Sequence, residues 1–141
     1  MMSDQNCIFC KIVTGEIPSF KIYEDDQTLA FMDINPASPG HALVIPKVHA
    51  ADVYGIRDDD IAAVARTSKR IAAAVESVLK PAGLNLLQCN GPGAAQGVYH
   101  FHMHVLPRTM GDELKLNWGP EPGDMDEIKE WADKIHAALE T

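Results

Sequence analysis

Short apolar runs separated by polar turns organise the first third of the chain. Residues 20–24 and 28–33 have the composition and spacing of two β-strands, and the charged turn 25–27 joins them as a hairpin. A loop containing two prolines and a glycine follows, and the apolar run 41–46 predicts a third strand.

The longest periodic stretch begins at the acidic triplet 58–60. Apolar residues then recur every three or four positions from Ile61 to Leu79, which places them on one face of a helix. Acidic residues suit the positive end of a helix dipole, and the Pro-Ala-Gly sequence at 81–83 ends the helix. The triplet has the composition of a cation site, but its position explains it better, so we expect this helix to be structural.

The second half of the chain predicts two more strands and a second helix. Residues 84–89 form a short apolar strand that leads into a glycine-rich loop, 90–97, and residues 99–107 alternate histidine with apolar side chains. Residues 109–123 are rich in glycine and proline and predict a loop. From Asp124 onward, apolar residues at helical spacing predict a C-terminal amphipathic helix, with a glutamate three residues later as the capping partner.

Three histidines at alternate positions are the most unusual feature of this pattern. Successive side chains of a strand point to opposite faces, so His100, His102 and His104 share one face, while the apolar residues between them face the core.

Three interpretations of these histidines are open. They are neutral rings gathered by chance, or ligands of one catalytic zinc, since a His-x-His strand can send two nitrogens to a metal. In the third interpretation the middle ring, His102, is a nucleophile and its neighbours orient it and bind an anion. A neutral imidazole can attack phosphorus if one nitrogen keeps its proton, and a carbonyl that accepts this proton fixes the tautomer.

Charge and length narrow the choice of partners. The 141 residues suffice for one domain, and 46% of them are apolar, enough to bury a core. The formal charge of −8 argues against a nucleic-acid polymer or an anionic membrane as partner, so any phosphate must be bound locally. We see neither a signal peptide nor a run of apolar residues long enough for a transmembrane helix, and we expect a cytoplasmic protein.

The cysteines indicate a metal site rather than a disulfide framework. There are three of them, an odd number, and Cys7 and Cys10 have the spacing at which a tight turn presents two thiolates to zinc. A thioredoxin-like motif would need a strand before Cys7, which the sequence lacks. The alternative is two reduced thiols that pack as small apolar side chains.

The stretch His-Phe-His-Met-His-Val-Leu at 100–106 resembles the signature of the histidine triad, or HIT, family of nucleotide hydrolases and transferases. The resemblance covers roughly residues 7–108 of a single domain, 1–141, and leaves the tail, 109–141, least covered. It implies an α+β fold with a five-stranded antiparallel sheet, the long helix packed on it and a C-terminal helix. It also implies a homodimer. Further matching segments are 7–12, 30–36, 40–47, Asn90 and 95–97.

For the histidines, the resemblance implies a two-step displacement without a catalytic metal. His102 attacks and forms a nucleotidyl-histidine that water hydrolyses. His104, as a protonated ring, binds the non-bridging oxygens. His100 fixes the strand geometry, and His41 supports the triad.

Substrate contacts are also implied by the resemblance. Asp33 binds the ribose hydroxyls, and Ile34 lies against the base. Asn90, Gln96 and Gly97 surround the scissile phosphate. Many relatives carry Ser or Thr at the position of Gly97, where the hydroxyl helps the leaving group to depart, so here the donor to the leaving group must be a backbone amide or water.

A structural zinc site and a partner contact complete these expectations. In relatives that carry the cysteine pair, a histidine after the third strand and the first histidine of the triad are the other zinc ligands. The implied set here is Cys7, Cys10, His49 and His100. The C-terminal segment of the family approaches the partner subunit's site, which makes Trp118 a candidate contact.

We therefore expect a hydrolase or transferase that cleaves the α-phosphate bond of small nucleotides, either purine nucleoside phosphoramidates or dinucleoside polyphosphates. One alternative is a nucleotide-binding regulatory module with little catalysis. Another is a metalloenzyme with one catalytic zinc on the three histidines. Removal of zinc would abolish turnover in the metalloenzyme, but would mainly lower stability if zinc is structural.

Overall fold

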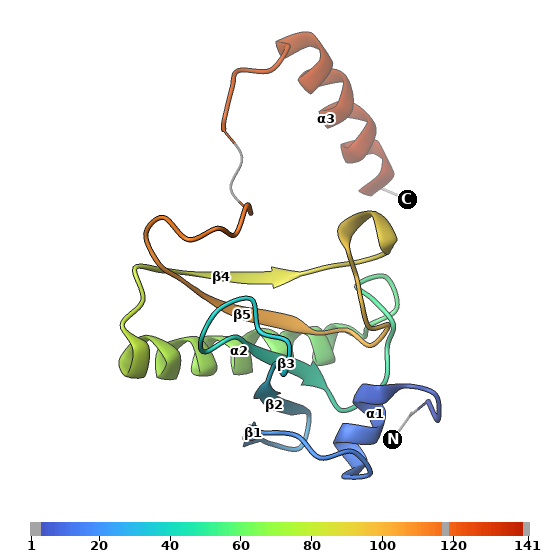
Figure 1. Ribbon diagram of the computed structural model, residues 1–141. Coiled ribbons are helices and arrows are strands. Elements are labelled where there is room, and N and C mark those ends of the chain that lie inside the picture. The colour runs from blue at the N-terminus through green and yellow to red at the C-terminus, as the bar shows by residue number, and fades with distance from the viewer. Residues whose placement is uncertain (1–3, 117–118, 140–141) are drawn as a thin grey trace.

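Five strands form one antiparallel sheet in this computed structural model, which describes residues 4–116 and 119–139. The spatial order is β1-β2-β3-β5-β4 (Figure 1). This confirms the predicted α+β fold, and the first four strands begin and end within one residue of the predicted bounds. The strands are β1 (Lys21–Glu24), β2 (Thr28–Met32), β3 (Ala42–Pro46), β4 (Gly83–Gln88) and β5 (Met103–Arg108).

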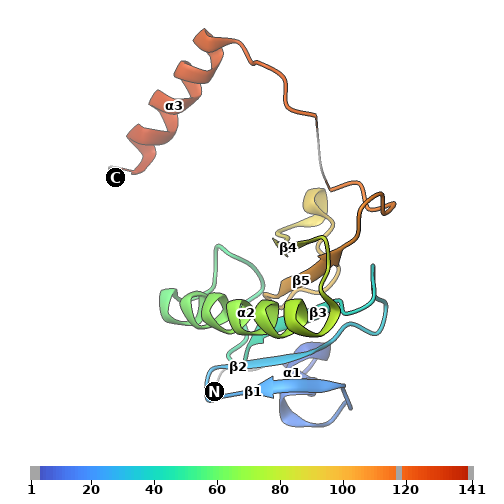
Figure 2. The same ribbon diagram turned by 90° about the vertical axis from the view of Figure 1, so that its left-hand side faces the viewer.

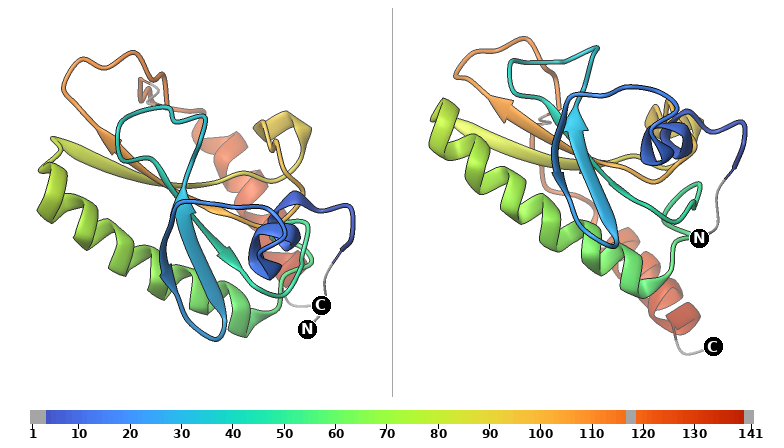
Figure 3. Two further views of the ribbon diagram at one scale, coloured as in Figure 1. Left: turned by 60° about the horizontal axis from the view of Figure 1, so that its bottom comes forward. Right: turned by 90° about the horizontal axis from the view of Figure 1, so that it is seen from below.

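The long helix α2 (Asp58–Leu79) covers one face of the sheet (Figures 2 and 3). Its buried side chains, among them Val64 and Ile71, pack with Phe101 and with residues of β2, β3 and β5. The predicted helix bounds are confirmed. The helix ends because Lys80 adopts a left-handed conformation, in which its N–H bonds back to the last turn.

A short helix, α1 (Ile8–Thr14), brings its side chains to the opposite core cluster of the sheet. The sequence pattern predicted no helix at the cysteine pair and indicated only the spacing of a tight turn. Cys7 is instead the N-cap, and its Sγ accepts the Cys10 N–H at 3.3 Å. Phe9 anchors the helix through an edge-on contact with Phe31, with ring centroids 5.5 Å apart.

Strand β5 begins at Met103, later than the alternation of residues 99–107 suggests. The alternation of side chains nevertheless extends back through the preceding residues. Phe101 packs in the α2 cluster, whereas the rings of His100 and His102 contact Phe9 on the other side. Residues 100–102 therefore keep the two alternating faces of a strand, although β5 is paired in the sheet only from Met103 onward.

The C-terminal helix α3 (Met125–Leu139) stands apart from the sheet at the end of a long connection (Figures 1 and 2). Asp124 caps it as predicted, because its Oδ1 accepts the N–H groups of Asp126 and Glu127 at 2.9 and 3.2 Å. None of its residues is buried. Trp118, the candidate partner contact, lies outside the described residues. Of the helices in the described part of the chain, none has both the length and the apolar character needed to cross a membrane.

Candidate functional site

His102 is held in one tautomer by the backbone of a neighbour. Its Nδ1 lies 2.7 Å from the carbonyl oxygen of His100, and because a carbonyl only accepts, Nδ1 carries the proton. The lone pair on Nε2 is therefore available for attack. Burial lowers the pKa of the His102 ring, so the ring is neutral at pH 7, which is the form that a nucleophile needs.

His41 and His104 form a second pair with fixed proton positions. The N–H of Ala37 donates to Nδ1 of His41 at 3.0 Å, so that ring carries its proton on Nε2. Nε2 of His41 donates this proton to Nδ1 of His104 across 2.9 Å, which leaves the His104 proton on Nε2. Burial lowers the pKa of His41 and lowers that of His104 to about 4. The sequence predicted a protonated His104, but in the free protein the ring is neutral and offers an Nε2–H donor.

A small apolar cleft lies beside these histidines. Its volume is 230 Å³, enough for one planar ring system, and its walls come from α1, β2, β3 and the segment after α1. Phe9 joins the cleft to the triad, since its ring also packs edge-on against His102 with centroids 5.3 Å apart. Asp33 and Ile34 line the cleft as well, and Ile34 is 76% exposed. Asp33 turns Oδ2 toward Nε2 of His41, 3.5 Å away, so it lies between the cleft and the histidines.

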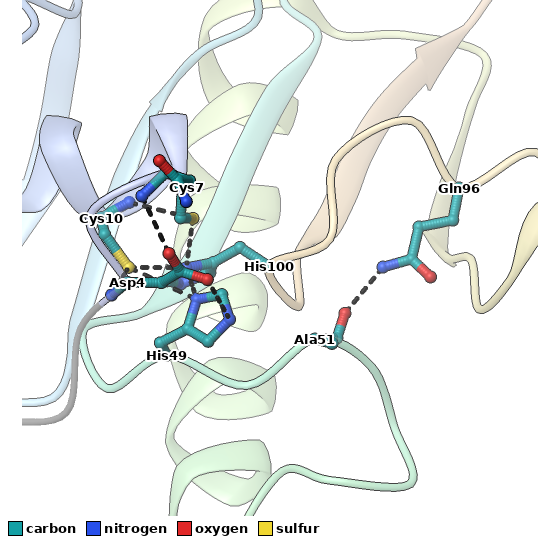
Figure 4. Close-up of polar contacts among 8 residues, drawn as sticks. Asp4, Cys7, Cys10, His49, Ala51, Gln96 and His100 are labelled. Carbon is teal, nitrogen blue, oxygen red and sulfur yellow. Dashed lines mark hydrogen bonds and ion pairs between the residues drawn. The ribbon is translucent and has the colours of Figure 1, made fainter.

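Gln96 links the glycine-rich loop to the segment that follows β3 through side-chain hydrogen bonds. Its side chain is only 6% exposed, and its Nε2 donates to the carbonyls of Ala51 and Val98 at 2.7 and 3.1 Å (Figure 4 shows the first). Its Oε1 accepts the Gly91 N–H at 2.8 Å. Both donors and the acceptor of the Gln96 amide are thus engaged within the protein, and its contact with a phosphate stays a prediction.

Asn90 and Gly97 lie in the same loop. Oδ1 of Asn90 accepts the Val53 N–H at 2.7 Å, and its Nδ2 donates to Gln88 at 2.6 Å. Around Gly97, an added Cβ would meet nothing within 4 Å, and its φ is not positive. A side chain would therefore fit at position 97.

Two cysteines and two histidines converge beneath α1 (Figure 4). Sγ of Cys7 and Sγ of Cys10 lie 3.3 and 3.5 Å from Nδ1 of His100. Nδ1 of His49 is 3.4 Å from Sγ of Cys10 and 3.2 Å from Nδ1 of His100. In a tetrahedral site with ordinary Zn–N and Zn–S bonds, donor atoms are about 3.3 to 3.8 Å apart. The structure thus brings together all four predicted ligands, with a donor set and spacing suited to zinc.

Proton positions separate this cluster from a second group of possible ligands. Nε2 of His100 donates to the carbonyl of Pro46 at 2.8 Å, so its Nδ1 presents a lone pair to the cysteines. The second group is formed by Asp33, His41 and His104. There Nε2 of His41 carries a proton, because its Nδ1 accepts from Ala37, and this nitrogen cannot bind a metal in that tautomer. The tautomers favour a metal in the first group.

Arg108, at the end of β5, is engaged away from the histidines. Its guanidinium donates to both carboxylate oxygens of Asp112 at 2.7 and 2.6 Å and to Asn85 at 2.8 Å. It lines a separate hollow of 480 Å³ that none of the histidines lines. The ion pair fixes the turn after β5.

Sequence reasoning missed two residues of the site. Phe9 forms a wall shared by the cleft and the triad, and its position between the two cysteines was the available signal. Asp4 donates its N–H to Sγ of Cys10 at 3.4 Å, and its Oδ2 lies 3.9 Å from Nε2 of His49. No pattern in the sequence marked Asp4.

The sequence matches the HIT domain over residues 14–111. The chain belongs to the HIT family. It is 45% identical over 121 residues to the Bacillus subtilis protein hit, covering 85% of this chain and 83% of that protein. It is 40% identical over 135 residues to the adenosine 5'-monophosphoramidase of Schizosaccharomyces pombe, covering 95% and 98% of the two chains.

Solved structures of HIT relatives share the fold. A Streptococcus mutans protein superposes with a TM-score of 0.92 at 37% identity, over 97% of this chain and 87% of that one. A zinc-bound histidine triad protein from Mycobacterium smegmatis gives a TM-score of 0.74 at 38% identity, over 96% of both chains. The sheet and its helices are therefore those of the HIT fold.

Proposed function

We propose that the protein hydrolyses small nucleotides at the α-phosphate through a covalent nucleotide on His102. The observation that carries the proposal is the 2.7 Å hydrogen bond from Nδ1 of His102 to the carbonyl of His100, because it leaves Nε2 as the free nucleophilic atom. The adenosine 5'-monophosphoramidase activity in the name of the S. pombe relative supports a purine nucleoside phosphoramidate as substrate. Dinucleoside polyphosphates offer the same α-phosphate linkage and are the second candidate class.

The reaction would run in two displacements at phosphorus. The lone pair on Nε2 of His102 forms the N–P bond, and the bond to the leaving group breaks with its electron pair going to that group. Position 97 carries no hydroxyl, so the leaving amine takes its proton from water. A second water then attacks phosphorus and gives a proton to the hydroxide left by the first, the N–P bond breaks with its electron pair returning to Nε2, and the nucleoside monophosphate leaves with the neutral imidazole restored.

Residues around His102 suit the parts of such a substrate. The apolar cleft would take the base beside Ile34, and the Asp33 carboxylate would accept from the ribose hydroxyls. His104, with its proton on Nε2, would donate to a non-bridging oxygen, held in place by His41. Asn90, Gln96 and Gly97 would shape the loop around the phosphate, mainly through backbone N–H groups.

We infer that Cys7, Cys10, His49 and His100 hold a structural zinc ion. The spacing of the four donor atoms and the free lone pair on Nδ1 of His100 support this, as does the zinc-bound M. smegmatis relative. Burial raises the pKa of the Cys10 thiol to about 11, so a cation is needed to stabilise its thiolate. The metal would fix this corner of the fold, and the residues that do the chemistry lie outside its ligand set.

We also propose that the protein works as a homodimer. Strand β4 lies at the edge of the sheet, where Leu86 is 49% exposed. The apolar side of α3 is open too, with Trp131 and Ile135 55% and 60% exposed. A second copy would cover both surfaces by symmetry. Analytical ultracentrifugation at micromolar concentration should give a dimer, and a monomer would contradict this.

Intact mass spectrometry tests the chemistry. After a brief incubation with adenosine phosphoramidate and a quench without acid, the wild-type chain should gain the mass of one adenylyl group, and His102→Ala should not. Absence of both an adduct and released nucleotide would favour a nucleotide-binding module with little catalysis. Release of nucleotide without an adduct at any quench time would favour direct attack by water.

A further inference from the structure

The segment 49–53, here called the bridging segment, connects the Cys–His cluster to the glycine-rich loop 90–97 (Figure 4). At its start, His49 turns Nδ1 toward Cys10 in the cluster. Two residues later, the carbonyl of Ala51 accepts from Nε2 of Gln96. The same short segment therefore contacts both sites.

Two more hydrogen bonds hold the bridging segment in place, one to the histidine stretch and one to the loop. The carbonyl of Ala50 accepts the Phe101 N–H at 2.7 Å, and the N–H of Val53 donates to Oδ1 of Asn90 at 2.7 Å. Residues 92–95 of the loop, by contrast, are all exposed. The loop thus depends on a few side-chain contacts for its position, and Gln96 makes the most buried of them.

We propose that Gln96 is a positioning residue through which metal occupancy of the Cys–His cluster controls the order of the glycine-rich loop. A bound metal would fix the His49 ring and, with it, the backbone carbonyl two residues on. A buried amide N–H that loses its carbonyl partner costs free energy, so Gln96 should follow the position of the Ala51 carbonyl. Gln96 in turn holds the Gly91 N–H, at the start of the loop.

This coupling rests on the proposed metal site and needs no nucleotide for its test. Hydrogen exchange of the amides in 90–97 would be measured with the full chain, loaded with zinc and after chelation. In the wild type, chelation should speed exchange of these amides at least about fivefold relative to the amides of α2. A factor of about five is the lower end of the coupling usually found between two sites. The variant Gln96→Leu should exchange fast in both states while it retains zinc, measured by metal analysis.

Two further variants complete the test. Gln88→Leu removes a glutamine from the same region whose side chain bonds to Cys89 and Asn90 and, among the described residues, not to the bridging segment, so it should keep the wild-type response to chelation. Gln96→Glu keeps the shape of the side chain but replaces the donor that faces Ala51. It is the test variant if Gln96→Leu folds poorly, and the amides of its loop should also exchange fast in both states. An equal response to chelation in the wild type and in both Gln96 variants would overturn the proposal, as would no response in the wild type.

Nucleotide binding provides a reciprocal check. Coupled sites must change each other's affinity by the same factor, so zinc should tighten AMP binding as much as AMP tightens zinc binding. In Gln96→Leu this factor should fall toward one. If exchange of the loop responds to zinc as expected but AMP does not bind, the proposed nucleotide function fails and the link through Gln96 stands.

Discussion

The carbonyl oxygen of His100 accepts the Nδ1 proton of His102, while the ring of the same His100 turns Nδ1 toward Sγ of Cys7, 3.3 Å away. The backbone of one residue thus orients the candidate nucleophile, and its side chain belongs to the Cys–His cluster. Because the two roles use different atoms, substitutions at His102 and in the cluster should have separable effects on turnover and stability.

Replacement of His102 should remove chemistry and spare binding. We expect His102→Ala to lower turnover of an adenosine phosphoramidate by at least about a thousandfold, since the variant loses the Nε2 lone pair that the His100 carbonyl leaves free for attack. AMP affinity, measured by calorimetry, should change by less than about fivefold, because the proposed base and ribose contacts lie in the cleft and not on His102. Turnover within tenfold of the parent would rule out the covalent route.

The proposed zinc site in the Cys–His cluster should contribute to stability. We expect Cys7→Ser to lose bound zinc and to melt on the order of 10 °C lower when free zinc is 100-fold above the parent's Kd, which corresponds to about 2.7 kcal/mol. Chelation of the parent should reproduce the shift. Cys89→Ser, at a half-buried cysteine outside the cluster, is the matched control and should keep its zinc. Equal zinc content and melting temperature in Cys7→Ser and the parent would contradict the site.

Acid should destabilise the fold through the buried histidines. The pKa of His104 falls from an ordinary 6.5 to about 4, first through burial and then through His102 and His41. The unfolded chain therefore binds the proton more tightly, so stability is fully present above pH 6.5 and declines as pH falls toward 4. Since the ring is partly exposed, we expect this one group to account for about 1 to 2 kcal/mol.

Chemical unfolding at a series of pH values, with chelator present to remove any contribution of the metal, measures this effect. The variant His104→Gln should show a shallower decline between pH 6.5 and 4 than the parent. Parallel curves for the two proteins would mean that His104 does not titrate as inferred.

The open space at Gly97 predicts that a hydroxyl can be added. Gly97→Ser should fold normally, because its Cβ would meet no atom within 4 Å. If the hydroxyl protonates the leaving group, turnover of phosphoramidates with poor leaving groups should rise about tenfold or more. Gly97→Ala adds the carbon without the hydroxyl and should stay at the parent rate. An equal change in both variants would show that loop stiffness, not proton donation, is responsible.

Much of the fold could be predicted from local patterns. The 3.6-residue periodicity from Asp58 to Leu79 predicted α2 to the residue, and alternation with turn signals predicted four strands closely, because these patterns depend only on neighbours along the chain. The motif around His100, His102 and His104 likewise marked the site. Helix α1 was missed, since it is short and its N-cap is a cysteine, a residue with little capping preference.

Tertiary structure decided what local sequence leaves open. The sequence supplied the residue types at the site, but the tautomers of His41, His100 and His102 follow from Ala37 N–H and the carbonyls of Pro46 and His100, which the fold brings into contact. Burial, which only the packed fold creates, made His104 neutral where the sequence suggested a charged ring. The engagement of Gln96 with Ala51 depends on two loops that meet across 45 positions, a long-range contact that no local pattern encodes.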